Sequence, residues 1–164
     1  MSYIKKCPEF RRGEYSEQHQ YSQAYQVRGI LGHKMIKFAL PIYFRNGSKD
    51  VLVGANSFRN MHFHLKNKLK KHYHKLVADK LSEFESINGQ FKTRYTYYYK
   101  NPSSDASNVV SQIEKFMLDA LIEINLVAND NVKYHIGSSW KVGGQDKEFP
   151  RIEIEIQGVE DESM

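Results

Sequence analysis

The stretch that decides the fold is Asp105–Asn131, DASNVVSQIEKFMLDALIEINLVANDN. It begins with an acid in a polar turn, continues as an amphipathic helix and ends in a second acidic loop. Its apolar residues recur at spacings of three and four, which is typical of one buried helix face. Ser107 or Asn108 is the expected N-cap. The expected buried stripe consists of Val110, Ile113, Met117, Ala120, Leu121 and Ile124.

A polar stripe runs along the other side of the same helix. At about 100° per residue, Lys115 lies within about 20° of Asn108, and Asp119 lies about 40° farther round. Asp105 precedes the helix, and Asp130 lies where a following strand is expected to begin. Two carboxylates brought together by a helix are what a divalent metal ion needs. A plainer interpretation makes Lys115 and Asp119 an ordinary i,i+4 pair and places the two acids in turns.

The segment before this helix predicts a strand, a turn and a first helix. Over residues 34–44, apolar residues alternate with others, as on a strand with one buried face. Pro41 has no backbone donor, so an edge position or a bulge is expected there. Asn46 and Gly47 predict a turn into a short return strand. A helix with one apolar stripe is then expected over residues 57–84.

Three further strands are expected around the two helices. Residues 91–99 carry tyrosines at alternate positions on one face. These rings fit stacking on exposed nucleotides, and they also fit packing on a half-buried strand. Residues 132–136 and 151–157 alternate in the same way. The expected fold class is α+β, a single domain with a small mixed β-sheet packed with two main helices.

The chain is expected to divide into an arm, one domain and a tail. Residues 1–33 are polar and fit a flexible arm, a partly ordered flap or an early strand over Tyr25–Ile30. Residues 34–158 form the domain, and residues 159–164 form an acidic tail. Cys7 is the one cysteine, so no disulfide forms within the chain. The chain lacks both the apolar run of ~20 residues that a membrane span needs and a signal peptide, so a soluble intracellular protein is expected.

The charge of the chain favours an anionic partner. The 164 residues carry a net charge of +5 with a pI of about 9.1, and nucleic acid is the first candidate. Lysines crowd the helix expected over residues 57–84, where acids are scarce. That scarcity favours contact with DNA phosphates over an ordinary solvated helix face. The lysines are Lys66, Lys68, Lys70, Lys71 and Lys75.

The same helix carries two H-x-H pairs. The spacing resembles that of metal ligands, but residues two apart on a helix point in nearly opposite directions. No zinc site is therefore expected here, and surface histidines are the simpler interpretation. The residues are His62, His64, His72 and His74.

The polar stripe and its flanks resemble the RusA-like crossover junction endodeoxyribonucleases, a family common in phages and prophages. That family carries a D-x-D-N element, a helix with K-x-x-x-D-A-L and a D-D pair before a strand. The matching residues are Asp105, Asn108, Lys115, Asp119-Ala120-Leu121 and Asp130. Asn56 and the basic segment after it resemble the Asn-led basic region of the family. Ser107 and Asn129 stand where the family has acids.

The resemblance implies a Mg²⁺-dependent endonuclease, with Mn²⁺ as a substitute. It implies a homodimer that resolves Holliday junctions or other branched DNA in recombination and repair, in the cytoplasm of a bacterial host. Asp105 and Asp130 would bind the metal, and Lys115 would offset charge on the scissile phosphate. Asn108 would orient a ligand or the water, and DNA would lie on Asn56 and the lysines of the first helix.

Two alternatives stay open. Ser107 and Asn129 favour a DNA-binding protein on the same fold, with a weakened or inactive site, that holds branched or single-stranded DNA. A protein-interaction module without a nucleic-acid role would leave the lysine face without a purpose.

Overall fold

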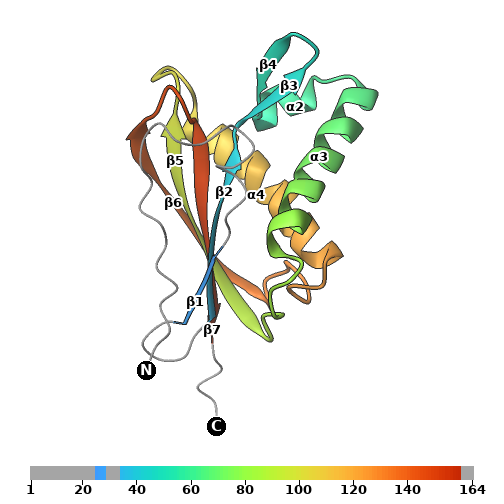
Figure 1. Cartoon of the computed structure of the whole chain (residues 1–164), viewed down its shortest axis with the longest axis vertical. Coiled ribbons are helices and arrows are strands. Elements are labelled where there is room, and N and C mark those ends of the chain that lie inside the picture. Colours follow the sequence, from blue (N-terminus) through green and yellow to red (C-terminus); the bar gives the residue numbers. More distant parts are fainter. Residues whose placement is uncertain (1–24, 29–33, 160–164) are drawn as a thin grey trace.

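The computed structural model describes residues 25–28 and 34–159 (Figure 1). The rest of the expected arm, and the tail from residue 160 onward, lie outside the described residues. The elements are β1 (Tyr25–Arg28), β2 (Lys34–Pro41), β3 (Tyr43–Asn46), β4 (Lys49–Leu52), α2 (Ala55–Arg59), α3 (Phe63–Leu81), β5 (Gln90–Tyr99), α4 (Ala106–Glu123), β6 (His135–Gln145) and β7 (Arg151–Val159).

The main sheet is mixed and has five strands in the order β1-β2-β7-β5-β6. β5 and β6 are parallel neighbours joined through α4, and the other neighbours are antiparallel. β7, the last strand along the chain, therefore lies between β2 and β5 (Figure 1). The predicted α+β class, with one mixed sheet and two main helices, is confirmed.

The core lies between one face of the sheet and the helices α3 and α4. Alternate residues of β2, β5 and β7 are buried, and both helices bury a stripe in the same cluster. Tyr95 and Tyr97 of β5 are 0% and 1% exposed, so these two rings pack in the core and cannot stack on nucleotides. No helix among the described residues is long and apolar enough to span a membrane.

The helix expected over residues 57–84 is in fact two helices, α2 and α3, with a break at residues 60–62. His62 is the N-cap of α3, and its Nδ1 accepts a hydrogen bond from the His64 N–H at 3.3 Å. Because His62 precedes the helix, its ring stacks on that of His64 with 5.1 Å between centroids. The expectation that these two rings diverge is therefore wrong.

The strand expected over residues 34–44 ends at Pro41, and the chain turns there into the separate β3–β4 hairpin. β1 pairs only with residues 34–37 of β2. Pro41 thus lies where β2 has one described neighbour, β7, which agrees with the edge position expected for it. In the hairpin, Asn46 pairs with Lys49, and Gly47 has φ +63°. The turn therefore depends on Gly47, while Asn46 stays in the strand.

The strand expected from Val132 begins later, at His135. Val132 is 93% exposed, and the Tyr134 N–H donates to the Asn131 carbonyl in a turn. β6 then continues to Gln145. Asp130 consequently lies inside a loop and not at the start of a strand.

Candidate functional site

Asp105 is the N-cap of α4, the role expected for Ser107 or Asn108. Its Oδ1 accepts hydrogen bonds from the Ser107 hydroxyl at 2.9 Å and from the Asn108 N–H at 3.3 Å. The carboxylate is exposed, so Asp105 satisfies the helix end while keeping its charge open to solvent. Ser107 stands where the family motif has its second acid. It therefore donates a hydrogen bond to Asp105, the residue at the first acidic position.

Asn108 joins α4 to α2. Its Oδ1 accepts the Asn56 N–H at 3.0 Å, and a Cβ on Gly54 would lie only 2.6 Å from its Nδ2. The structure therefore brings Asn56 and Asn108 together. The donor is the backbone N–H of Asn56, not its side chain. The side-chain oxygen of Asn108 therefore bonds to α2 and not to Asp105 or its surroundings.

Two tyrosines lie near this end of α4. The Tyr97 hydroxyl is 2.9 Å from the Ser104 hydroxyl. Burial raises the pKa of Tyr97, and the charge of Asp105 raises it further. Burial also raises the pKa of Tyr43, with contributions from Tyr97 and Asp50. Asp105 therefore lies near two partly desolvated tyrosine hydroxyls, those of Tyr97 and Tyr43, at the carboxyl end of β5.

Lys115 is exposed on α4, ten residues after Asp105. That separation corresponds to a rise of about 15 Å along the helix axis. Lys115 and Asn108 lie on one stripe, as expected, but Lys115 is almost three turns from Asp105 at the start of the helix.

Asp130 lies beyond the opposite end of α4. Its N–H donates to the Asn129 side chain at 2.8 Å. The same loop is held at the beginning of β5, where the Phe91 N–H donates to the Tyr134 carbonyl at 2.8 Å. Asp105, in contrast, follows the far end of β5 at Tyr99.

The structure therefore does not bring Asp105 and Asp130 together within one chain. α4 has 18 residues and rises about 27 Å between them. Within one chain, these two acids are too far apart to bind the same Mg²⁺ ion. Residues 34–159 contain no group of three or more His, Cys, Asp or Glu side chains placed to hold a metal ion. Mg²⁺ is usually held by one or two carboxylates, and waters and substrate phosphates complete its six oxygen ligands.

The five lysines of α3 do not all line one groove. Lys66 donates to the Arg59 carbonyl at 3.1 Å and lies 5.4 Å from the centroid of the Phe58 ring, so it folds back on α2. Lys68 lies over Phe44 on the hairpin side, 5.9 Å from the ring centroid. Neither side chain lines the groove formed by the other three lysines.

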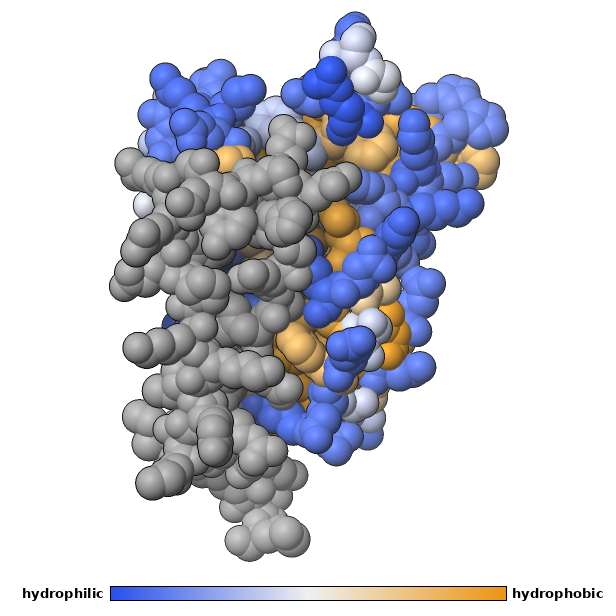
Figure 2. All heavy atoms as spheres, in the orientation of Figure 1, coloured by the Kyte–Doolittle hydropathy of each residue, from blue (hydrophilic) through white to orange (hydrophobic). Residues whose placement is uncertain are grey.

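The remaining three lysines, Lys70, Lys71 and Lys75, line a groove between α3 and α4. The groove has a volume of about 520 Å³ and also contains His74 and Glu123. Charged and polar side chains gather on the side of the molecule where α3 lies (Figure 2). His74 Nδ1 contacts the Glu123 carboxylate, which is the one acid of the groove lining. The lysines therefore outnumber the acid three to one.

A second groove was not anticipated from the sequence. It has a volume of about 640 Å³ and lies between the hairpin, α3 and the loop before β7. Tyr43, His72 and Phe149 line it, and Lys100 Nζ lies 5.5 Å from the centroid of the Tyr43 ring. Its residues come from four distant segments, so no local pattern in the sequence indicates it.

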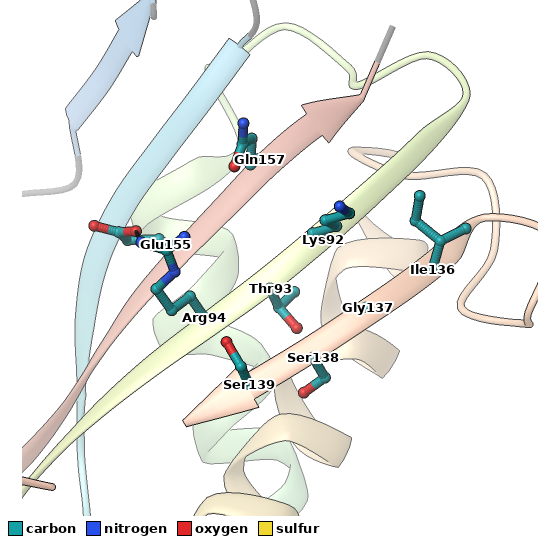
Figure 3. A pocket seen from close by; sticks show the side chains of 9 residues that line it. All are labelled: Lys92, Thr93, Arg94, Ile136, Gly137, Ser138, Ser139, Glu155 and Gln157. Carbon is teal, nitrogen blue, oxygen red and sulfur yellow. Dashed lines mark ion pairs between the residues drawn. The ribbon is translucent and has the colours of Figure 1, made fainter. Parts of the chain in front are cut away.

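A smaller hollow of about 300 Å³ lies on the sheet between β5, β6 and β7 (Figure 3). Glu155 is the acid in its lining. It pairs with Lys37 at 3.0 Å and with Arg94 at 3.6 Å. The acid is therefore held in ion pairs within the sheet surface.

Comparison with known proteins does not identify a family. No protein-family model matches the chain, and no curated protein matches it. The solved structure of the HypE–HypF complex is similar at 15% identity with a TM-score of 0.34. The match covers 81% of this chain and 34% of that one, so this chain spans about a third of its length.

Proposed function

We propose that this protein binds DNA through the groove between α3 and α4. The observation that carries the proposal is the set of three exposed lysines in that groove, Lys70, Lys71 and Lys75, with one acid beside them. Ammonium groups that neutralise phosphates release condensed counterions, which provides affinity for any nucleic-acid backbone. The groove is open along two helices, which suits an extended polyanion better than a small enclosed ligand.

The test measures binding to a synthetic four-way junction and to a linear duplex over a range of salt concentrations. Replacing Lys70, Lys71 and Lys75 with Gln is expected to weaken binding and to lower the slope of log K against log salt by up to about 2.7. Glu123→Gln is expected to strengthen binding, because it removes the one negative charge in the groove.

A matched control removes the same charge elsewhere. Lys49, Lys92 and Lys133 are exposed and lie outside this groove, on β4, β5 and the loop before β6. Replacing these three with Gln should leave the salt slope close to that of the wild-type protein. An equal loss in the two triple variants would mean that only the net charge matters, and the groove proposal would fail.

A second candidate is a metal-dependent endonuclease that acts on Holliday junctions or other branched DNA as a homodimer. It is favoured by the exposed carboxylate of Asp105 at the start of α4, with Asn108 and Asn56 joined beside it. These residues occupy positions of the RusA-like motif in the order that the family has them. Lys115 would offset negative charge on a phosphate placed along α4.

The endonuclease candidate predicts that purified protein nicks a synthetic Holliday junction in the presence of Mg²⁺ or Mn²⁺. Asp130→Asn should abolish cutting and leave junction binding intact, because Asp130 lies outside the lysine groove. Absence of cutting with both metals on several junction sequences would remove this candidate and leave the DNA-binding proposal in place.

A further inference from the structure

The proposed function leaves unused the groove between the β3–β4 hairpin, α3 and the loop before β7, which we call the hairpin groove. Its volume of about 640 Å³ lies in the range of sites for small organic ligands, which measure about 300–1,000 Å³. Five half-buried side chains give it apolar walls, namely Pro41, Tyr43, Leu76, Phe149 and Pro150. Two of these walls are aromatic rings, so the groove suits a flat ligand with an apolar face.

The lining of the hairpin groove also carries unpaired positive charge. Arg45 is held by Asp50, with 3.3 Å between Nη1 and Oδ1. Among the residues that the structure describes, no carboxylate forms an ion pair with Lys100 or Lys147, and both side chains are exposed. Glu148 is the other acid of the lining. The two lysines outnumber it, which favours a ligand with negative charge.

The loop that carries Lys147 and Phe149 is fixed by Asp146. The Asp146 Oδ1 accepts the N–H groups of Glu148 at 3.2 Å and of Phe149 at 3.0 Å. Arg151 Nη1 donates to the Asp146 Oδ2 at 2.9 Å and to the Phe149 carbonyl at 3.0 Å. Because these bonds hold the loop, one aromatic wall of the groove is in place before a ligand arrives, which lowers the entropy cost of binding.

The hairpin groove adjoins the groove between α3 and α4. His72 and Leu76 of α3 line the first, and Lys71 and Lys75 of the same helix line the second. Burial lowers the pKa of His72, and the charge of Lys75 lowers it further, so these two side chains lie close together. A chain of phosphates bound along the lysines therefore has a short path into the hairpin groove.

We propose that the hairpin groove binds one unpaired nucleotide of the DNA held between α3 and α4. The base packs against the rings of Tyr43 and Phe149, because every base has a flat face that stacks on aromatic side chains. Lys100 and Lys147 neutralise the phosphates on either side of it. The identity of the strand rests on the proposed function, whereas the affinity of the groove for a nucleotide rests on its own lining.

Lys100 changes its partner when the base enters. In the structure its Nζ lies 5.5 Å from the centroid of the Tyr43 ring. Such a contact between an exposed cation and a ring is weak, and the lysine stem is flexible. The base takes the face of the Tyr43 ring, and the ammonium group turns to the phosphate.

The base is tested with three DNA duplexes that share one paired sequence. The first is blunt, the second has a short single-stranded extension of thymidines, and the third has an extension of the same length without bases. Wild-type protein should bind the thymidine extension about fivefold or more tightly than the extension without bases, because only the former has a base to stack. Equal binding of these two would overturn the inference. This comparison needs no variant protein.

The rings are tested with matched substitutions. Tyr43→Leu and Phe149→Leu should each reduce the preference for the thymidine extension, whereas Tyr43→Phe keeps a ring and should retain it. Tyr134→Leu removes a half-buried ring outside the groove and should also retain it. A preference that survives both leucine variants in the groove, or that Tyr134→Leu reduces equally, contradicts the assignment.

The lysines are tested in the same assay. Combined Lys100→Gln and Lys147→Gln should weaken binding of both extended duplexes more than binding of the blunt duplex, because the phosphates of the extension lie against these lysines. Combined Lys92→Gln and Lys133→Gln removes the same charge at exposed residues outside the groove. This control should affect the three duplexes alike, and an equal pattern in both double variants would refute the phosphate contacts.

Thymidine 5′-monophosphate alone separates this inference from the proposed function. Calorimetric titration should show equal binding to wild-type protein and to the variant with Gln at residues 70, 71 and 75, and weaker binding to Tyr43→Leu. If the nucleotide binds but no DNA does, the proposed function fails, and the assignment of the groove to a nucleotide is supported. If the nucleotide binds but the thymidine extension gives no preference, the groove takes free nucleotides, and its role toward a strand is overturned. Absence of nucleotide binding overturns the assignment itself.

Discussion

Asp105 has a structural role that must be separated from any chemical one. Its side chain caps α4 by accepting the Asn108 N–H, and its charge remains exposed. A substitution that merely unfolds the start of α4 would imitate the loss of a catalytic carboxylate. Serine offers a way to separate the two roles, because it caps helices well and carries no charge.

We expect Asp105→Ala to lower the free energy of unfolding by about 1 kcal/mol, and Asp105→Ser to stay within about 0.5 kcal/mol of wild type. The endonuclease candidate predicts that neither variant cuts DNA in the presence of a metal ion. Urea unfolding followed by circular dichroism provides the comparison. If serine costs as much stability as alanine, the charge of Asp105 itself stabilises α4, and the two roles are not separable in this way.

His72, on α3, makes the stability of the protein depend on pH. Its ring packs against Phe44 with 5.0 Å between centroids. Burial lowers the pKa of His72, and the charge of Lys75 lowers it further. The unfolded chain therefore binds the proton at a higher pH than the folded chain does. Stability is complete above the unfolded pKa of about 6.5 and decreases as the pH falls below it.

We expect His72→Gln to reduce this loss of stability between pH 7 and pH 5. His64→Gln, at an exposed residue near the start of α3, should leave the slope as it is in the wild-type protein. Urea unfolding at pH 7, 6 and 5 measures both. An unchanged slope in His72→Gln would assign the acid sensitivity to other groups.

At the scale of the elements, the contact between α2 and α4 is tight enough to exclude a methyl group. A Cβ on Gly54 would meet the side chain of Asn108, which is already held by the Asn56 N–H. The φ of Gly54 is −148°, an extended value that any residue adopts. Space, and not backbone strain, therefore requires glycine at this position.

We expect Gly54→Ala to cost about 1–3 kcal/mol, because Asn108 must move and give up its bond to α2. In an Asn108→Ala background the same substitution should cost clearly less, so the two changes should be non-additive. A double-mutant cycle in urea measures the coupling. Additive costs would show that Asn108 can move aside freely.

The sequence predicted the elements whose patterns are undisturbed by neighbouring turns. β7 and the buried stripe of α4 follow their patterns, because each buries one face against a single core. The break between α2 and α3 was missed because no glycine or proline marks it, and Met61 and Leu65 continue the apolar stripe across it. Val132 fits the alternating pattern of a strand in the sequence, but in the structure it is an exposed residue of a turn.

For the candidate site, the sequence proposed a set of residues but did not predict how they are arranged in space. The angular argument placed Asn108 and Lys115 on one stripe of α4 correctly, because that depends only on helix geometry. It treats only the rotation about the helix axis and leaves out the rise along that axis, which separates Asp105 before the helix from Asp130 after it. The separation of Asp105 from Asp130 follows from the parallel β5-α4-β6 connection, in which the helix runs the length of the strands.

At the scale of the whole molecule, the position of β7 determines when the sheet can be completed during synthesis. β2 and β5 belong to one sheet only through β7, which pairs with both of them. Until residues 151–159 are available, β5 and β6 can pair with each other, but the edges of β2 and β5 have no common partner. Sequence-distant pairings of this kind form late and slowly. An incomplete chain released at that point would expose core surface and be prone to aggregation.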